Sequence, residues 1–263
     1  MWLIKIGGGE KIHLEGIIRD LAESRETSII LHGANAIRDQ LAQRLGIQKR
    51  VVQSISGYSS VLSDPSIIDL QMMAYAGLRN KRIVELCQRY GLNAVGLSGI
   101  DGQCIQGKRN AGIRVREGGK NLLLKDFSGK PQSVNVELLR FLLDHQYVPV
   151  LTVPILDENG FAINSENDDI LHVLHATFHA EKIFQFIEAP GFLENKDDPS
   201  SLVSFLPAQE LAQREAQVEG RMKRKLLALR KLFEHGPTTV YIADGRTEHP
   251  LKDALAGKGT RIQ

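Results

Sequence analysis

A lysine and three glycines near the N-terminus of this 263-residue chain are of the residue types that can bind phosphate. Near the N-terminus, Lys5 is followed by the triplet Gly7, Gly8 and Gly9. Glycines let backbone N–H groups approach anionic oxygens without a side chain in the way, and a nearby lysine adds positive charge. A glycine triplet is also an ordinary tight turn, and the Walker spacing is missing. This motif therefore allows phosphate binding without establishing it.

An acidic segment and a basic helix supply further charges. Asp168 opens a predicted helix, where a carboxylate can either cap the helix or hold lysines that neutralise a transferring phosphoryl group. Lys225 ends a basic stretch, residues 221–225, that begins an amphipathic helix and can equally be a solvated face. Together these residue types would suit phosphoryl transfer.

Short apolar runs rich in Ile, Val and Leu predict the strands that position these residues. The runs are continuous rather than alternating, which is typical of a parallel sheet covered by helices on both faces, so we predict an α/β fold. The predicted strands are residues 3–6, 28–31, 94–97, 148–153, 183–187 and 239–243. The predicted helices are residues 35–45, 65–90, 136–146, 168–179 and 218–234.

Two further glycine-containing turns end predicted strands, one at His32 and Gly33 and one at residues 96–102. Ligands bind outside the carboxyl ends of parallel strands, so we expect the three turns to converge at one sheet edge. Residues 105–130 break this pattern. Two short apolar segments there flank Gly118 and Gly119 and predict an inserted antiparallel hairpin.

Composition excludes several classes of function. Lys and Arg number 33 against 31 Asp and Glu, and the net charge of +2 gives no global attraction to nucleic acid or membranes. Two cysteines, Cys87 and Cys104, lack the spacing of a zinc or redox pair. His172, His175 and His179 can share a helical face, but no ligand pattern completes a metal site, so we expect none. Without a targeting or membrane-spanning segment, a soluble cytoplasmic protein is expected.

In combination, the motifs resemble the amino acid kinase family, in particular its acetylglutamate kinase branch and the kinases that act on [LysW]-aminoadipate or [LysW]-glutamate. The resemblance extends along the whole chain in the family's order. It rests on residues 5–8, 32–33, 80–82, 96–102, 162–168, 189–191, 221–225, 243–245 and 257–260.

This resemblance implies an open αβα sandwich with a mainly parallel central sheet, two lobes and an inserted β-hairpin. Residues 1–160 would bind the amino acid and its carrier, and residues 161–263 would bind ATP with Mg²⁺. Lys5 and Lys225 would straddle the transferring phosphoryl group while Asp168 organises both lysines. The residues implied for ATP and its phosphates are Gly7, Gly8, Gly9, Glu188, Gly191 and Asp244. Those implied for the substrate are Gly33, Ala34, Val61 and Asn164.

Three positions depart from the family's pattern. Ala34 replaces the second glycine after the histidine, and its methyl group narrows the approach to the backbone. Val61 stands where the family has an arginine that grips the substrate's carboxylate, a contact that an aliphatic side chain cannot make. Glu188 replaces the usual Asp or Asn, a milder change. The phosphoryl side is intact, so we interpret these departures as altered substrate recognition.

The preferred function is therefore a kinase that phosphorylates the side-chain carboxylate of aminoadipate or glutamate on a small acidic, LysW-like carrier protein, in lysine or arginine biosynthesis. The inserted flap, residues 105–130, supports this partner because it holds seven basic and only two acidic residues. The alternatives are an acetylglutamate kinase acting on free N-acetylglutamate and a non-catalytic regulatory protein of the same fold. We expect a homodimer and no nucleic-acid partner.

Overall fold

An eight-stranded sheet forms the centre of the computed structural model, which describes residues 1–263 except 54, 56–58, 118–119, 196 and 219. Its strand order is β14-β16-β15-β13-β1-β2-β10-β5, and all neighbouring strands are parallel except β15 and β16. The strands are β1 (Trp2–Ile6), β2 (Ser28–His32), β5 (Ala94–Ser98), β10 (Val148–Thr152), β13 (Lys182–Ile187), β14 (Phe205–Leu206), β15 (Thr239–Asp244) and β16 (Thr260–Ile262). The predicted parallel sheet is confirmed.

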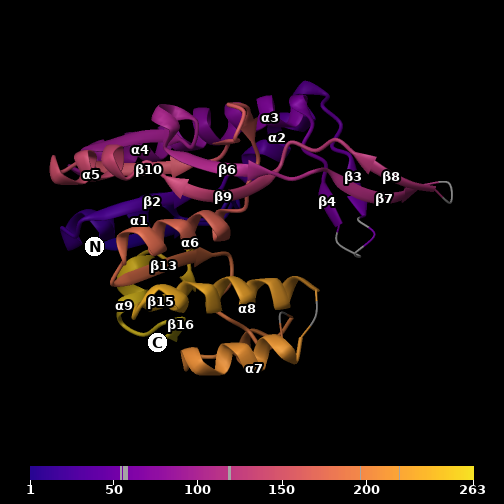
Figure 1. Cartoon of the computed structure of the whole chain (residues 1–263). Coiled ribbons are helices and arrows are strands. Elements are labelled where there is room, and N and C mark those ends of the chain that lie inside the picture. The colour runs from indigo at the N-terminus through magenta and orange to yellow at the C-terminus, as the bar shows by residue number, and fades with distance from the viewer. Residues whose placement is uncertain (54, 56–58, 118–119, 196, 219) are drawn as a thin grey trace.

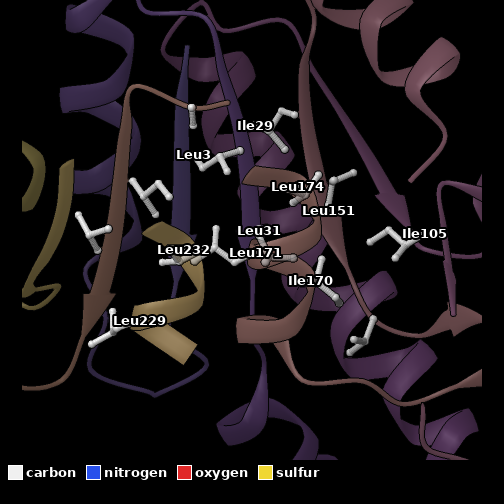
Figure 2. Close-up of a cluster of buried hydrophobic side chains, with 14 of the residues drawn as sticks. Leu3, Ile29, Leu31, Ile105, Leu151, Ile170, Leu171, Leu174, Leu229 and Leu232 are labelled. Carbon is white, nitrogen blue, oxygen red and sulfur yellow. The ribbon is translucent and has the colours of Figure 1, made fainter. Parts of the chain in front are cut away.

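Helices cover both faces of this sheet (Figure 1). Alternate residues of β1 enter two separate cores, because successive side chains of a strand point to opposite faces. Ile4 and Ile6 pack with α1 (Leu14–Ser24), α4 (Asn80–Arg89) and α9 (Pro250–Leu255). Leu3 packs on the other face with α5 (Val136–Asp144), α6 (Asn167–Phe178) and α8 (Gly220–Leu232). Figure 2 shows this second core, where leucines of α6 and α8 meet the sheet.

The inserted region holds more structure than the predicted hairpin. A second sheet has the order β12-β11-β6-β9, with β6 (Ile105–Arg109), β9 (Gly129–Val134), β11 (Ile155–Leu156) and β12 (Ala162–Ile163). The antiparallel pair β7 (Ile113–Glu117) and β8 (Lys120–Leu124) confirms the hairpin, although its turn at residues 118 and 119 lies outside the described residues. A further pair, β3 (Val51–Gln53) and β4 (Ser59–Val61), packs against β7 through Val52 and Val115.

These two ribbons project from one end of the molecule, away from α7 (Leu211–Ala216) (Figure 1). Strands β6, β9, β11 and β12 were not predicted, because they are short and β6 and β9 contain glycine and several polar residues. Within the described part of the chain, no helix has the length and apolar character required to cross a membrane.

The predicted helix over residues 65–90 is a continuous helical run with an unusual centre. It comprises α3 (Pro65–Gln71), the π-helical segment η1 (Met72–Arg79) and α4. Asp64 caps its start by accepting a hydrogen bond from the Ile67 amide at 3.0 Å. The other predicted helix at this edge, α2 (Asn35–Leu45), has the predicted bounds.

Both cysteines are buried, and burial raises the pKa of each to about 12.

Candidate active site

Lys5 and Asp168 meet on the sheet face that α6 and α8 cover. Lys5 lies on β1 with the same orientation as Leu3, and its Nζ donates a hydrogen bond to Asp168 Oδ1 on the first turn of α6. A weaker contact joins Nζ to Gln185 Oε1 at 3.4 Å, on the adjacent strand β13. The helix cap is Glu166 and makes no side-chain hydrogen bond, so the capping role considered for Asp168 is wrong.

Lys225 approaches the same carboxylate from α8. Together with Asp168, Gln185 and Leu171 it lines a small pocket between α6, α8 and β13. Burial lowers the pKa of Lys225, the positive charge of Lys5 lowers it further, and the charge of Asp168 raises it. Lys5 and Lys225 therefore share the negative charge of Asp168, although they are 163 and 57 residues away from it along the chain.

The first two glycine turns pack directly against each other beside this cluster. Gly33 donates its backbone N–H to Ile6 O at 2.9 Å, and Ala36 donates to Gly8 O at 3.0 Å. A Cβ on Gly8 would lie 2.6 Å from the Asn35 nitrogen and 2.8 Å from the Ala34 nitrogen. No side chain fits there, so only glycine allows the two strand ends to meet.

The third glycine turn lies at the same sheet edge but does not join the first two. Strand β5 is separated from β2 by β10, and Gly99 packs against Ile155. Asp101 stabilises this turn by accepting hydrogen bonds from the backbone and side chain of Ser98, both at 2.7 Å. The expected convergence of three turns is therefore correct for two of them.

The residues expected to bind substrate come from separate segments. Asn164 Nδ2 donates to Ser63 Oγ at 3.3 Å, which links the Asn164 segment to the stretch that follows Val61. Val61 ends β4 and is half-buried. Ala34 is fully buried at the start of α2, one residue after Gly33. These contacts place the Val61 and Asn164 segments side by side.

The residues expected to bind nucleotide follow β13 and β15, which are adjacent and parallel. Glu188 accepts a hydrogen bond from the Lys11 amide at 2.6 Å and packs against Gly9. Burial opposes ionisation of Asp244, but hydrogen bonds from Arg246 keep the pKa of this carboxyl below its usual value. Gly191 packs tightly against Thr260. All three lie beside the carboxyl ends of central strands.

Sequence reasoning missed two polar groups at the site. Gln185 is flanked on both sides by apolar residues of β13, and a polar residue in that setting was the available signal. Tyr75 donates its hydroxyl to Asn35 Oδ1 next to the second glycine turn, and an isolated tyrosine in a helix gives no such signal. His172 and His175 on α6 and His179 directly after it do not form a shared site. His172 faces His235, with Nε2 atoms 3.4 Å apart, and burial lowers the pKa of His175 to about 4.

This arrangement can stabilise negative charge at the end of a sheet. Two cations flank one carboxylate, and two turns packed against each other lie at the carboxyl ends of β1 and β2. The model of the amino acid kinase family matches residues 1–244. The chain belongs to the amino acid kinase family.

Relatives and solved structures agree with this membership. The chain is 36% identical to a [LysW]-aminoadipate kinase from Thermus thermophilus, over the full length of both proteins. It is 30% identical to an acetylglutamate kinase from Methanopyrus kandleri, again over both full lengths. Its fold is similar to that of a carbamate kinase from Giardia, with a TM-score of 0.67, 13% identity and coverage of 99% of this chain and 97% of the other.

The amino acid kinase fold predicted from the sequence is confirmed, and the chain is a phosphotransferase. A role as a non-catalytic regulatory protein is therefore not retained. The roles of individual residues and the lobe boundary at residue 160 stay predictions.

Proposed function

We propose that this amino acid kinase transfers the γ-phosphoryl group of ATP to the side-chain carboxylate of aminoadipate or glutamate held on a small acidic, LysW-like carrier protein. The product is an acyl phosphate for lysine or arginine biosynthesis. The observation that carries the reaction is the cluster of Lys5, Asp168 and Lys225 at the carboxyl end of the central strands. The name of the Thermus relative supports the choice of substrate.

The reaction needs little covalent chemistry from the protein. A carboxylate oxygen of the substrate attacks the γ-phosphorus, the bond from that phosphorus to the β-phosphate oxygen breaks, and ADP leaves with both bonding electrons. No proton is transferred. Catalysis then consists of positioning and of neutralising charge on the transferring group.

The chain's residues fit these requirements. Lys5 and Lys225 would contact the oxygens of the phosphoryl group, and Asp168 would hold both lysines in place between turnovers. In the Gly7–Gly9 turn, the Gly7 N–H already donates to Phe186 O at 2.9 Å, so Gly8 and Gly9 would donate N–H groups to phosphate oxygens. Glu188, Gly191 and Asp244 would lie toward the nucleotide. Mg²⁺ would enter with ATP and be held mainly by its phosphates.

The substrate would bind on the side of residues 1–160, and ATP on the side of residues 161–263. Asn164 and the backbone of Gly33 and Ala34 would contact the amino acid. With Val61 in place of the expected arginine, less of the binding would come from a carboxylate clamp and more from the carrier.

The basic flap supports a carrier of negative charge. Lys108, Arg114, Arg116, Lys120 and Lys125 are exposed, and none of them forms an ion pair with the residues that the structure describes. Arg114 and Arg116 point away from the small core that Ile113 and Val115 enter. Exposed cations without an ion pair, on β6 and on or beside the projecting β7–β8 ribbon, attract an acidic partner.

Two other flap cations are already engaged within the chain. Arg109 stacks 3.7 Å from the Phe127 ring centroid and donates to Asp126 O at 3.0 Å, and Lys130 pairs with Asp169. These two residues are better left unchanged in a test of docking, because their substitution would disturb the flap itself.

The decisive experiment traps acyl phosphate with hydroxylamine and compares carrier-bound aminoadipate, carrier-bound glutamate and free N-acetylglutamate. The variant Lys108→Glu/Arg114→Glu should bind the carrier about tenfold more weakly at low salt, and the difference should shrink as salt is added. ATP affinity should be unchanged. The control Arg44→Glu/Arg140→Glu makes the same change in net charge at exposed positions outside the flap.

Equal carrier affinity for the flap variant and the control would refute docking through the flap. Efficient turnover of free N-acetylglutamate without a carrier would favour the alternative named by the Methanopyrus relative, an acetylglutamate kinase.

A further inference from the structure

Arg79 is a buried cation beside the glycine turns, and within the described residues it forms no ion pair. It ends η1, and only 8% of its surface is exposed. Its Nη2 donates one long hydrogen bond, 3.4 Å, to Gly7 O. Its Nε has no hydrogen-bond partner, and within the described part of the chain no carboxylate forms an ion pair with it.

The charge of Arg79 is only partly offset by its surroundings. Burial lowers the pKa of its guanidinium, while the negative charge of Glu188 raises it, and a guanidinium stays protonated in proteins. Neighbouring His32 is fully buried, which lowers its pKa to about 3, with a smaller contribution from Arg79. His32 is therefore neutral and adds no compensating charge. Buried charges are normally paired, so a guanidinium that has no ion pair favours an anion bound close to it.

The helix that carries Arg79 contacts both glycine turns. Tyr75 and Arg79 are four residues apart on η1, so they lie on one face of this helical segment. Tyr75 donates to Asn35 Oδ1 at the second turn, and Arg79 donates to Gly7 O at the first. Gly8 is held between these contacts, against Ala34 and Asn35. Single π-helical segments frequently occur at functional sites.

We propose that Arg79 is a positioning residue for phosphoryl transfer: it holds the Gly7 carbonyl, and its buried positive charge favours an anionic phosphoryl group on the Gly7–Gly9 turn. This inference rests on the proposed kinase reaction and adds a third cation to Lys5 and Lys225. The anion is the phosphoryl group rather than the substrate's carboxylate, because the contact of Arg79 is with Gly7 and not with the Asn164 segment.

The test compares binding of MgADP alone with binding of MgADP plus aluminium fluoride, which mimics the transferring phosphoryl group. In Arg79→Met, the affinity for MgADP alone should stay within about twofold of the wild type. The increase in that affinity when aluminium fluoride is added should be about tenfold smaller than in the wild type. The unfolding temperature should not fall, because the variant removes a buried charge that has no ion pair. Arg82→Met is the matched control, since Arg82 lies on the following helix, is 63% exposed and pairs with Glu85.

The proposal would be overturned if aluminium fluoride increased the affinity of Arg79→Met for MgADP as much as it does in the wild type. It would also be overturned if Arg79→Met lost the same affinity for MgADP alone and for MgADP plus aluminium fluoride. If Arg79→Met does not fold, Arg79→Lys replaces it, because a shorter cation that cannot hold Gly7 should lose part of the gain. This comparison needs no carboxylate substrate. A wild-type protein that binds the mimic but forms no acyl phosphate would refute the proposed function and leave the role of Arg79 standing.

Discussion

Replacing Asp168 by asparagine is the sharpest test of the lysine cluster, because it removes one charge and almost no volume. In the structure the carboxylate accepts a hydrogen bond from Lys5 and its charge raises the pKa of Lys225. Without it, the two lysines would repel each other across the position of the phosphoryl group. Both cations would then be less well placed, and Lys225 would lose its proton more easily.

The expected effect separates catalysis from stability. Removing one preorganised charge-stabilising contact from an active site typically reduces turnover about 100- to 1,000-fold, or about 2.7–4 kcal/mol. The effect on the free energy of unfolding should stay below about 1 kcal/mol. Asp168 has a side-chain exposure of 41%, so solvent screens much of its attraction to Lys5.

The assay measures acyl phosphate formation with saturating carrier-bound substrate, together with thermal unfolding of each variant. Asp144→Asn is the control, because it makes the same change of charge and volume at an exposed position at the end of α5, outside the lysine cluster and the flap. Its turnover should change less than about twofold. If Asp168→Asn keeps near-normal turnover, or if both variants lose turnover equally, the role assigned to Asp168 is wrong.

Two further predictions follow from the same geometry. Turnover of the wild type should fall at basic pH as Lys225 loses its proton, and at a lower pH than for an ordinary lysine, because burial and the charge of Lys5 lower the pKa of Lys225. Lys225→Met should reduce turnover by orders of magnitude and abolish this decline. A pH–rate profile of Lys225→Met that keeps the same decline would contradict the assignment. Gly8→Ala should lower the free energy of unfolding by about 1–3 kcal/mol, measured by denaturant unfolding, because the alanine Cβ would lie 2.6 Å from the Asn35 nitrogen. An unfolding midpoint equal to that of the wild type would show that the two turns are not packed as described.

The central sheet could be predicted from the sequence because its strands are buried on both faces. Continuous apolar runs such as the one around Ile29 and Ile30 can only belong to covered strands, and all six predicted strands are present. The second sheet could not be predicted in the same way. Strands such as β11 and β12 are two residues long and depend on pairing with β6, which no local pattern records.

The candidate site divides in the same way. Local sequence determined which residues could handle phosphate, since Lys5 and the glycines are adjacent in the chain and Lys225 stands in a basic segment. Only the tertiary structure decided that Lys5, Asp168 and Lys225 meet, because β1, α6 and α8 are brought together by long-range packing of the core. It also decided that Arg79 is buried against Gly7. The buried side of a helix depends on the elements that pack against it, and the sequence of the helix alone does not show that Arg79 lies on that side.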